Sequence, residues 1–465
     1  MRPPVEPRSC ADWHVSRRAL VNRGCAVLPI PAGALDGLAT FERAGGLNRR
    51  EVLTGTVGLI AMCTSLGACA GNESAAQAAL DAAGAAHADD PDAPVLVSLY
   101  LDGGNDGLNT LVPLADPRYR KLRSRIAISE GAAIVLGDAP EFGWHPSLPG
   151  LANLYEAGKV AVLPAVDYAN PDLSHFNSAH YWRTGIVGHA ADPSGWLGRT
   201  LDLIGTDDNP LQGISVQNSL DPVLLPAHAP VATVLVPSDF NFWMDGVSDE
   251  QVQLGLLRDL AADRSGGSAI RASRGALRSA ITTCERLRPL ADGSREGSTY
   301  PASDLGQSLQ SLARMLSAGF GTRVAAVRHG GGFDSHEEQP EQHAKNLADL
   351  DEALVAWQAD LERRGLADRV LTLVWSEFGR RPADNESNGT DHGAGGLVLV
   401  VGNRANGGIR SEFPGLARLD PLENLLVTTP FRDVYASLLE GWMGVDAGRV
   451  LPGIGSSRIP LVRPL

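Results

Sequence analysis

The segment that decides the fold is Val95-Leu-Val-Ser-Leu-Tyr-Leu101, followed at once by Asp102-Gly-Gly-Asn-Asp-Gly-Leu-Asn109. An apolar run of this length is typical of a strand buried on both faces, as in a parallel sheet. The glycines that follow permit a tight turn that other residues would resist. The segment therefore predicts a buried strand whose carboxyl end presents polar side chains.

Four further apolar runs predict more strands of the same sheet, at residues 160–166, 323–329, 369–375 and 397–402. Apolar residues at helical spacing, in 305–316, 347–361 and 434–442, predict amphipathic helices between or after them. The alternation predicts an α/β fold, a three-layer α/β/α sandwich around a mostly parallel central sheet. Ligands of such sheets bind beyond the carboxyl ends of the strands.

Composition limits the function classes. The chain has 465 residues, of which 43% are hydrophobic, enough for a sizeable core. A net charge of −14 leaves no basic surface of the kind that nucleic acid requires, so we expect no nucleic-acid partner. Only Cys284 lies beyond the first 70 residues, and no C-x-x-C pair exists, so the body must be held together by its core.

The amino-terminal region predicts export. Arg49 and Arg50 precede a mildly apolar segment without charge, so residues 48–72 are typical of a twin-arginine signal. The end of this segment resembles a lipobox around Cys69. Two outcomes are compatible with it: Cys69 is acylated and retained, or an ordinary cleavage nearby removes Cys69. We expect a disordered extension at 1–47, an Ala-rich linker at 73–94, and a folded domain at 95–465 with an insertion or cap at about 200–300. The predicted location is the periplasm or cell envelope.

Polar residues follow the predicted strands. After the first strand, Asp102 and its neighbours offer carboxylates and an amide, which suit a hard cation. An Asx-rich turn without any ligand explains the same residues. After the second strand, Ser174 stands at a predicted helix start, where backbone N–H groups face a bound anion. Its hydroxyl is either a nucleophile activated by a metal or a plain N-cap.

The third strand is followed by Asp334 and His336, which share one face of an extended segment and form a plausible pair of metal ligands. We expect His343, further along, on the surface of a helix. After the fourth strand come Glu377 and Arg380, and the guanidinium could hold a tetrahedral oxyanion. A structural ion pair between Glu377 and Arg380 is the alternative. His392 follows, next to a carboxylate and before the fifth strand.

These motifs together resemble an exported bacterial family, known as domain of unknown function 1501, over about residues 45–460. The resemblance is carried by the segments Asn-Arg-Arg-Glu-Val-Leu (48–53), Leu-Asp-Gly-Gly-Asn-Asp-Gly-Leu-Asn (101–109), Ser-His-Phe (174–176), Tyr-Trp (181–182), Gly-Trp-Leu-Gly-Arg (195–199), Phe-Asp-Ser-His (333–336), Ser-Glu-Phe-Gly-Arg (376–380) and Gly-Thr-Asp-His-Gly (389–393). That family in turn resembles a divergent branch of the alkaline phosphatase–sulfatase superfamily.

The resemblance implies that the central sheet carries one or two divalent ions (zinc, calcium, magnesium or manganese). It also implies that the protein hydrolyses phosphate or sulfate esters. It implies Ser174 as the nucleophile and metal ligands at the positions Asp102, Asp334, His336, Glu377 and His392. In the mechanism expected from these residues, Arg380 stabilises the developing charge. One departure is Phe378, which stands where the superfamily has a histidine ligand, so one ion could be lost.

Two functions are therefore expected. The first is an exported, metal-dependent hydrolase of small anionic phosphate or sulfate esters. The second is a non-catalytic, metal-stabilised binding or assembly protein of the cell envelope. The sequence leaves the oligomeric state open.

Overall fold

The computed structural model describes residues 93–129, 131–188, 193–237, 240, 250–263, 267–291 and 300–463. The predictions for the extension (1–47), the signal segment (48–72, with Cys69) and the linker as far as residue 92 lie outside the described residues.

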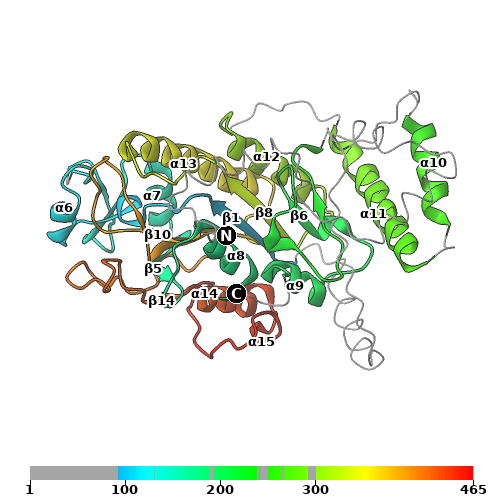
Figure 1. The fold of residues 1–465 in the computed structure, drawn as a ribbon. Helices are drawn as coiled ribbons and strands as arrows, with labels where there is room; N and C mark the ends of the chain where they lie inside the picture. Colours follow the sequence, from blue (N-terminus) through cyan, green and yellow to red (C-terminus); the bar gives the residue numbers. More distant parts are fainter. Residues whose placement is uncertain are drawn as a thin grey trace, which may run out of the picture. The chain divides into compact units, whose positions relative to one another are not determined.

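A nine-stranded sheet runs through the main domain (Figure 1). Its strands are β1 (Val95–Leu101), β5 (Val160–Asp167), β6 (Gly213–Ser215), β7 (Ala232–Thr233), β8 (Val324–His329), β9 (Val370–Trp375), β12 (Gly396–Val401), β13 (Gly408–Ile409) and β14 (Thr429–Pro430). The order is β13-β5-β12-β9-β1-β8-β6-β7, and β14 also pairs with β5. The five strands predicted from apolar runs are confirmed to within one residue at each end.

Strand β1 lies in the middle of the sheet, parallel to both β8 and β9. All seven of its residues are buried, as the unbroken apolar run predicts. The polar exception, Ser98, accepts a hydrogen bond from the indole N–H of Trp375 at 2.8 Å. This bond satisfies both polar groups inside the core.

Strand β12 is the exception to the parallel order, because it runs antiparallel to its neighbours β5 and β9. Its amino end therefore lies at the edge where the parallel strands have their carboxyl ends. The residues that precede β12, including His392, are thus delivered to the same edge as those that follow β1, β8 and β9.

Helices cover both faces of the sheet (Figure 1). On one face, α7 (Pro149–Glu156), α12 (Asp304–Ser317) and α13 (Gln339–Arg363) pack against the odd-numbered residues of β1. On the other face, α8 (His175–Thr184), α9 (Trp196–Ile204) and α14 (Phe431–Leu438) pack against its even-numbered residues. The predicted three-layer α/β/α sandwich around a mostly parallel sheet is confirmed.

Shorter elements complete the domain. They are α5 (Gly107–Thr110), β2 (Leu111–Pro113), α6 (Arg118–Leu122), β3 (Ile134–Val135), β4 (Phe142–Trp144), two 3₁₀ turns (Pro210–Gln212 and Pro222–Leu224), β10 (Gly379–Arg380), β11 (His392–Gly393), a π-helical turn (Leu439–Met443) and α15 (Ala447–Val450). Strands β10 and β11 pair with each other, so that Arg380 lies opposite His392.

The region from 200 to 300 differs in part from the expected cap. Strands β6 and β7 extend the central sheet, because their short apolar segments pair in parallel beyond β8. Two helices follow, α10 (Glu250–Ala262) and α11 (Ser268–Ala291). Of the described residues, 250–263 and 267–275 belong to a second compact unit. None of the helices in the described ranges is both long and apolar enough to cross a membrane.

Candidate metal centre

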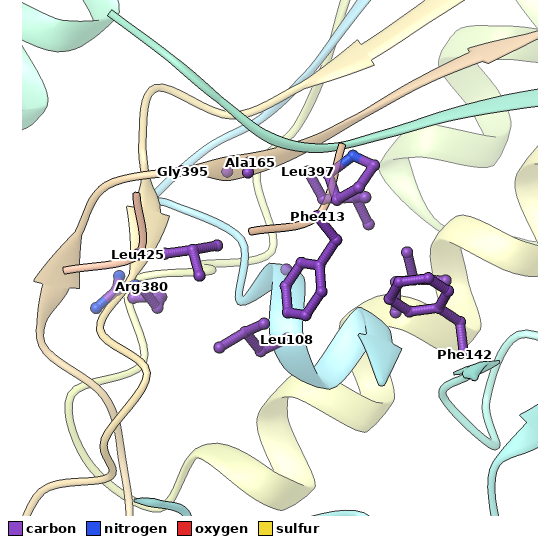
Figure 2. Close-up of a pocket in the computed structure, with 12 residues that line it drawn as sticks. Leu108, Phe142, Ala165, Arg380, Gly395, Leu397, Phe413 and Leu425 are labelled. Atoms are coloured by element: carbon purple, nitrogen blue, oxygen red, sulfur yellow. The ribbon is translucent and has the colours of Figure 1, made fainter. Parts of the chain in front are cut away.

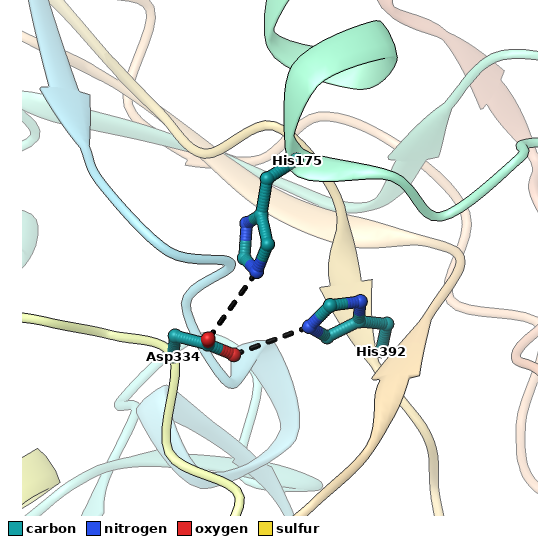
Figure 3. A group of neighbouring side chains, drawn as sticks. All are labelled: His175, Asp334 and His392. Atoms are coloured by element: carbon teal, nitrogen blue, oxygen red, sulfur yellow. Dashed lines mark hydrogen bonds and ion pairs between the residues drawn. The ribbon is translucent and has the colours of Figure 1, made fainter. Parts of the chain in front are cut away.

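Two imidazoles meet one carboxylate at the carboxyl edge of the sheet (Figure 3). His175 Nε2 lies 3.3 Å from Asp334 Oδ2, and His392 Nε2 lies 3.1 Å from Asp334 Oδ1. His175 begins helix α8, Asp334 lies in the loop after β8, and His392 is in β11. One ligand atom from each residue lies within 4.8 Å of the other two, a spacing that one metal ion could bridge.

A third imidazole stands at the rim of this cluster. His336 Nε2 lies 3.0 Å from Asp334 Oδ1 and 3.0 Å from His392 Nε2. Its side chain is 40% exposed, whereas those of His175 and His392 are about half as exposed, at 21% and 18%. His336 thus lies beside the three-residue cluster and is its more accessible neighbour.

The outer nitrogens of the three rings determine where the inner ones point. Each Nδ1 faces an oxygen, which is Glu377 Oε1 at 2.7 Å for His175, the Leu173 carbonyl at 2.9 Å for His392 and Asp391 Oδ1 at 3.3 Å for His336. When each Nδ1 donates its hydrogen outward, each neutral ring presents an Nε2 lone pair toward Asp334. Imidazole lone pairs around one carboxylate, oriented by outer acceptors, are the donor set that a divalent cation requires.

The electrostatics of the cluster favour positive charge beside Asp334. Burial alone would raise the pKa of Asp334, but the three imidazoles and Arg380 hold it well below its usual range. Burial likewise disfavours a charged His175, yet its contacts with Asp334 and Glu377 raise its pKa to about 9. A protonated His175 therefore supplies, without an ion, part of the charge that a cation would bring.

Phe378 forms the floor of the site. Its ring is fully buried, with its centroid 4.8 Å from that of His175 and 4.5 Å from that of His392. An apolar floor lowers the local dielectric and strengthens the binding of an ion. Among the described residues, no second group of three metal-ligating side chains gathers.

Two predicted ligands, Asp102 and Glu377, lie elsewhere. The Asp102 carboxylate pairs with the guanidinium of Arg328 and is absent from the three-residue cluster. The turn after β1 leads this side chain toward β8. Glu377 contacts His175 Nδ1 through Oε1 at 2.7 Å, but its oxygens also accept from the N–H groups of Gly103 and Gly104, and it is not one of the three residues of the cluster.

Arg380 also has a different environment from the expected one. Its guanidinium is fully buried and donates to the carbonyls of Gly104 and Thr390 at 2.8 and 2.9 Å, and to Asp334 Oδ1 at 2.7 Å. The guanidinium also donates hydrogen bonds to the carbonyls of Gly103 and Phe333. Committed to these acceptors, Arg380 positions Asp334 rather than offering free N–H groups to an oxyanion.

Ser174 stands directly before His175, at the amino end of α8, as predicted. Its hydroxyl makes no capping hydrogen bond to the helix, so the N-cap alternative does not account for it. Its N–H donates to Asp172 Oδ1 at 2.9 Å, and the carbonyl before it accepts from His392. The backbone on both sides of Ser174 is thus tied to the metal cluster.

No role was predicted for His175, whereas the carboxylate next to His392, that of Asp391, was expected. The signal for His175 was present, since it follows Ser174 at a helix start that meets the edge of the sheet. The expected surface position of His343 is wrong: this histidine is buried, 3.0 Å from Asn105 Oδ1, and burial lowers its pKa to about 3. It faces the inner side of the turn after β1, away from solvent.

A pocket is lined in part by Arg380 (Figure 2). Its lining is mostly apolar and includes Leu108, Leu397, Phe413 and Leu425. Arg380 is its one charged lining residue, and its guanidinium is committed to the acceptors named above. The pocket therefore offers shape but no polar anchor for a ligand.

The fold and the site define an α/β protein with a candidate divalent-metal centre at the carboxyl edge of its sheet. Residues 161–461 match the family model described as "Protein of unknown function (DUF1501)", and the chain belongs to this family.

Several solved structures resemble the chain at low identity. They include the phosphonate monoester hydrolase of Agrobacterium radiobacter (10% identity, 78% of each chain covered, TM-score 0.34), the PsFucS1 sulfatase from Pseudoalteromonas sp. (12% identity, 84% of this chain and 78% of that chain, TM-score 0.33) and the alkaline phosphatase from the Antarctic bacterium TAB5 (11% identity, 67% of this chain and 91% of that chain, TM-score 0.28). These TM-scores are too low to argue for a shared function. Among curated proteins no significant match is found.

Proposed function

We propose that this protein is an exported, metal-dependent hydrolase of small phosphate or sulfate esters, with Ser174 as its nucleophile. The observation that carries the proposal is the convergence of imidazole nitrogens on Asp334 directly beside the start of α8. A binding module would have little need for such a donor set next to an uncommitted hydroxyl.

The residues fit a divalent ion, which would be held by His175, Asp334 and His392, with His336 at the rim. When bound, such an ion supplies a Lewis acid that lowers the pKa of a neighbouring hydroxyl and attracts an anionic ester. Imidazole-rich sets favour zinc or other transition metals over calcium and magnesium, which prefer oxygen ligands.

Ser174 would act from the helix start. Its Oγ loses a proton, attacks the phosphorus or sulfur atom and forms a new ester bond, while the alcohol of the substrate departs and takes up a proton. Water then hydrolyses the serine ester and restores the hydroxyl. The amino end of α8 stabilises the negative charge that develops there. Glu377 and Arg380 keep His175 and Asp334 in place.

The test is hydrolysis of a panel of phosphate and sulfate esters by the purified protein, with zinc, manganese, magnesium or calcium added in turn. We expect activity with at least one ion, and its loss in Ser174→Ala with metal content and folding retained. Ser303→Ala is the matched control, because Ser303 is another helix-start serine whose side chain caps Gly306 N–H at 3.1 Å. That variant should lose some stability and keep its activity. Full activity in Ser174→Ala, or none on the whole panel, would refute the hydrolase.

A specific observation favours the second candidate, a non-catalytic, metal-stabilised protein of the cell envelope. Arg380, the cation expected to stabilise the transition state, is buried and bonded to the backbone. In that case metal would bind and stabilise the fold, but no ester of the panel would be hydrolysed.

Export belongs to the same proposal, on the basis of Arg49 and Arg50. Replacing both by lysine should retain the protein in the cytoplasm of the producing bacterium, as judged by cell fractionation. Cys69→Ser separates the two processing routes, because it abolishes membrane association only if Cys69 is acylated.

A further inference from the structure

We propose that Glu377 is a positioning residue of the metal centre, which fixes the ring of His175 so that its Nε2 faces the ion. The turn Gly103-Gly104 binds the carboxylate of Glu377 and keeps it beside His175. The inference rests on the metal site of the proposed function, and it is independent of which ester, if any, is hydrolysed.

The carboxylate of Glu377 is enclosed by the turn after β1. It is completely buried, and it accepts hydrogen bonds from Gly103 N–H at 3.1 and 3.2 Å and from Gly104 N–H at 3.0 Å. The two glycines have φ of +115° and +80°, so their successive N–H groups point to one side. Such a concave run of N–H groups binds an anionic group, here the side chain of Glu377.

The turn itself is packed too closely to shift. A Cβ at Gly103 would lie 2.4 Å from the backbone nitrogen of Asp334, and a Cβ at Gly104 would lie 2.3 Å from the ring of Phe378. The carbonyls of the same two glycines accept hydrogen bonds from Arg380, which also bonds Asp334. The turn therefore connects to the metal ligands through its N–H groups on one side and its carbonyls on the other.

From this position Glu377 reaches His175. Its Oε1 accepts from the Nδ1 of the imidazole at 2.7 Å. Since the turn N–H groups and this ring nitrogen donate to the carboxylate, the hydrogen of a neutral His175 stays on Nδ1. Its Nε2 is buried, has no hydrogen-bond partner and points at Asp334, which is the orientation needed to bind an ion. Substitution of an outer carboxylate of this kind commonly lowers metal affinity by about 10- to 100-fold.

The decisive variant is Glu377→Gln, which keeps size and shape. The glutamine oxygen can still accept from the turn, but its amide N–H₂ then faces His175 Nδ1. The ring must accept there and carry its hydrogen on Nε2, where it blocks the ion. We expect zinc affinity to fall by about 10- to 100-fold, as measured by competition with a chromophoric chelator, without substrate.

The second step asks whether Glu377 acts through His175. In a His175→Ala background, Glu377→Gln should cause no further loss of zinc affinity, whereas a purely structural role would lower it again. Asp351→Asn is the matched control, because Asp351 is a buried carboxylate that likewise accepts two backbone N–H groups, from Gly150 and Leu151, and bonds no imidazole. It should lower stability and leave zinc affinity unchanged.

Glu377→Asp guards against misfolding of the glutamine variant. It keeps the charge but is one methylene shorter, so it cannot hold both the turn and His175, and zinc affinity should again fall. Wild-type affinity in both Glu377 variants, or an equal loss with and without His175, would overturn the positioning role. A protein that binds zinc but hydrolyses no ester would refute only the proposed function, and one that binds no zinc would overturn both.

Discussion

At the scale of single residues, Asp167 is a buried acid outside the metal centre. It is fully buried at the end of β5, and burial raises its pKa to about 7, although the N–H groups of Tyr168 and Gly395 donate to it. In the unfolded chain an aspartate titrates near ~3.9. The folded state thus prefers protonated Asp167, so the stability due to this preference is present below about pH 4 and is lost as the pH rises through about 7.

We expect Asp167→Asn to remove this loss. Between about pH 4 and pH 7 the wild type should lose free energy of unfolding relative to the variant, by on the order of 1–4 kcal/mol. Urea unfolding of both proteins at several pH values measures the difference, in which all shared titrations cancel. Parallel pH profiles would show that Asp167 is ionised in the folded protein at no cost.

The candidate site could be predicted only in part from its residues. Asp334, His336 and His392 meet as expected, because polar residues at strand ends share one edge of the sheet. His175 was not predicted as a ligand, because a helix start at Ser174 already accounted for this segment. The partners of Asp102 and Arg380 could not be predicted, because Arg328 and the bonded carbonyls meet them only through the three-dimensional path of the turn.

At the scale of elements, helix α9 depends on two glycines of the motif at 195–199. A Cβ at Gly195 would lie 2.1 Å from the carbonyl oxygen of Val223, and one at Gly198 would lie 2.1 Å from that of Leu225. Both glycines let the helix pack directly against the chain at 222–226. Arg199 then donates to the carbonyl of Val450 at 2.8 Å.

Gly198→Ala should therefore destabilise the protein by about 1–3 kcal/mol, because the helix must move away from its neighbour. Gly255→Ala in α10 is the control, since a Cβ there would meet nothing within 4 Å. That change should stabilise its helix by about 0.5–1 kcal/mol. Chemical denaturation measures both, and equal effects would contradict the packing argument.

Whole elements were easier to predict than their directions. Strands β1, β5 and β9 are continuous apolar runs, so their spans could be predicted to within a residue. The antiparallel direction of β12 left no mark on its sequence, because a strand buried on both faces is apolar in either direction. Strands β6 and β7 are too short to show a period at all.

At the scale of the whole molecule, a bound ion should stabilise the fold, because its ligands come from distant parts of the chain. Zinc at 100 times its dissociation constant should raise the free energy of unfolding by about 2.7 kcal/mol. Thermal unfolding with zinc and with a chelator measures this, and we expect a higher Tm with zinc. His392→Ala should remove the difference, whereas an unchanged Tm in the wild type would argue against a single folded-state site.

The place of β12 also constrains the order of assembly. It separates β5 from β9, which have no hydrogen-bonded contact without it, and it is encoded more than two hundred residues after β5. A growing chain can thus pair β1 with β8 before its last quarter is made, but β9 and β12 both lie in that quarter, so β5 joins the other strands only when β12 has been synthesised. His392 arrives with that closing strand, so ion capture would report that the sheet is complete, and cofactor loading would come after folding rather than guide it.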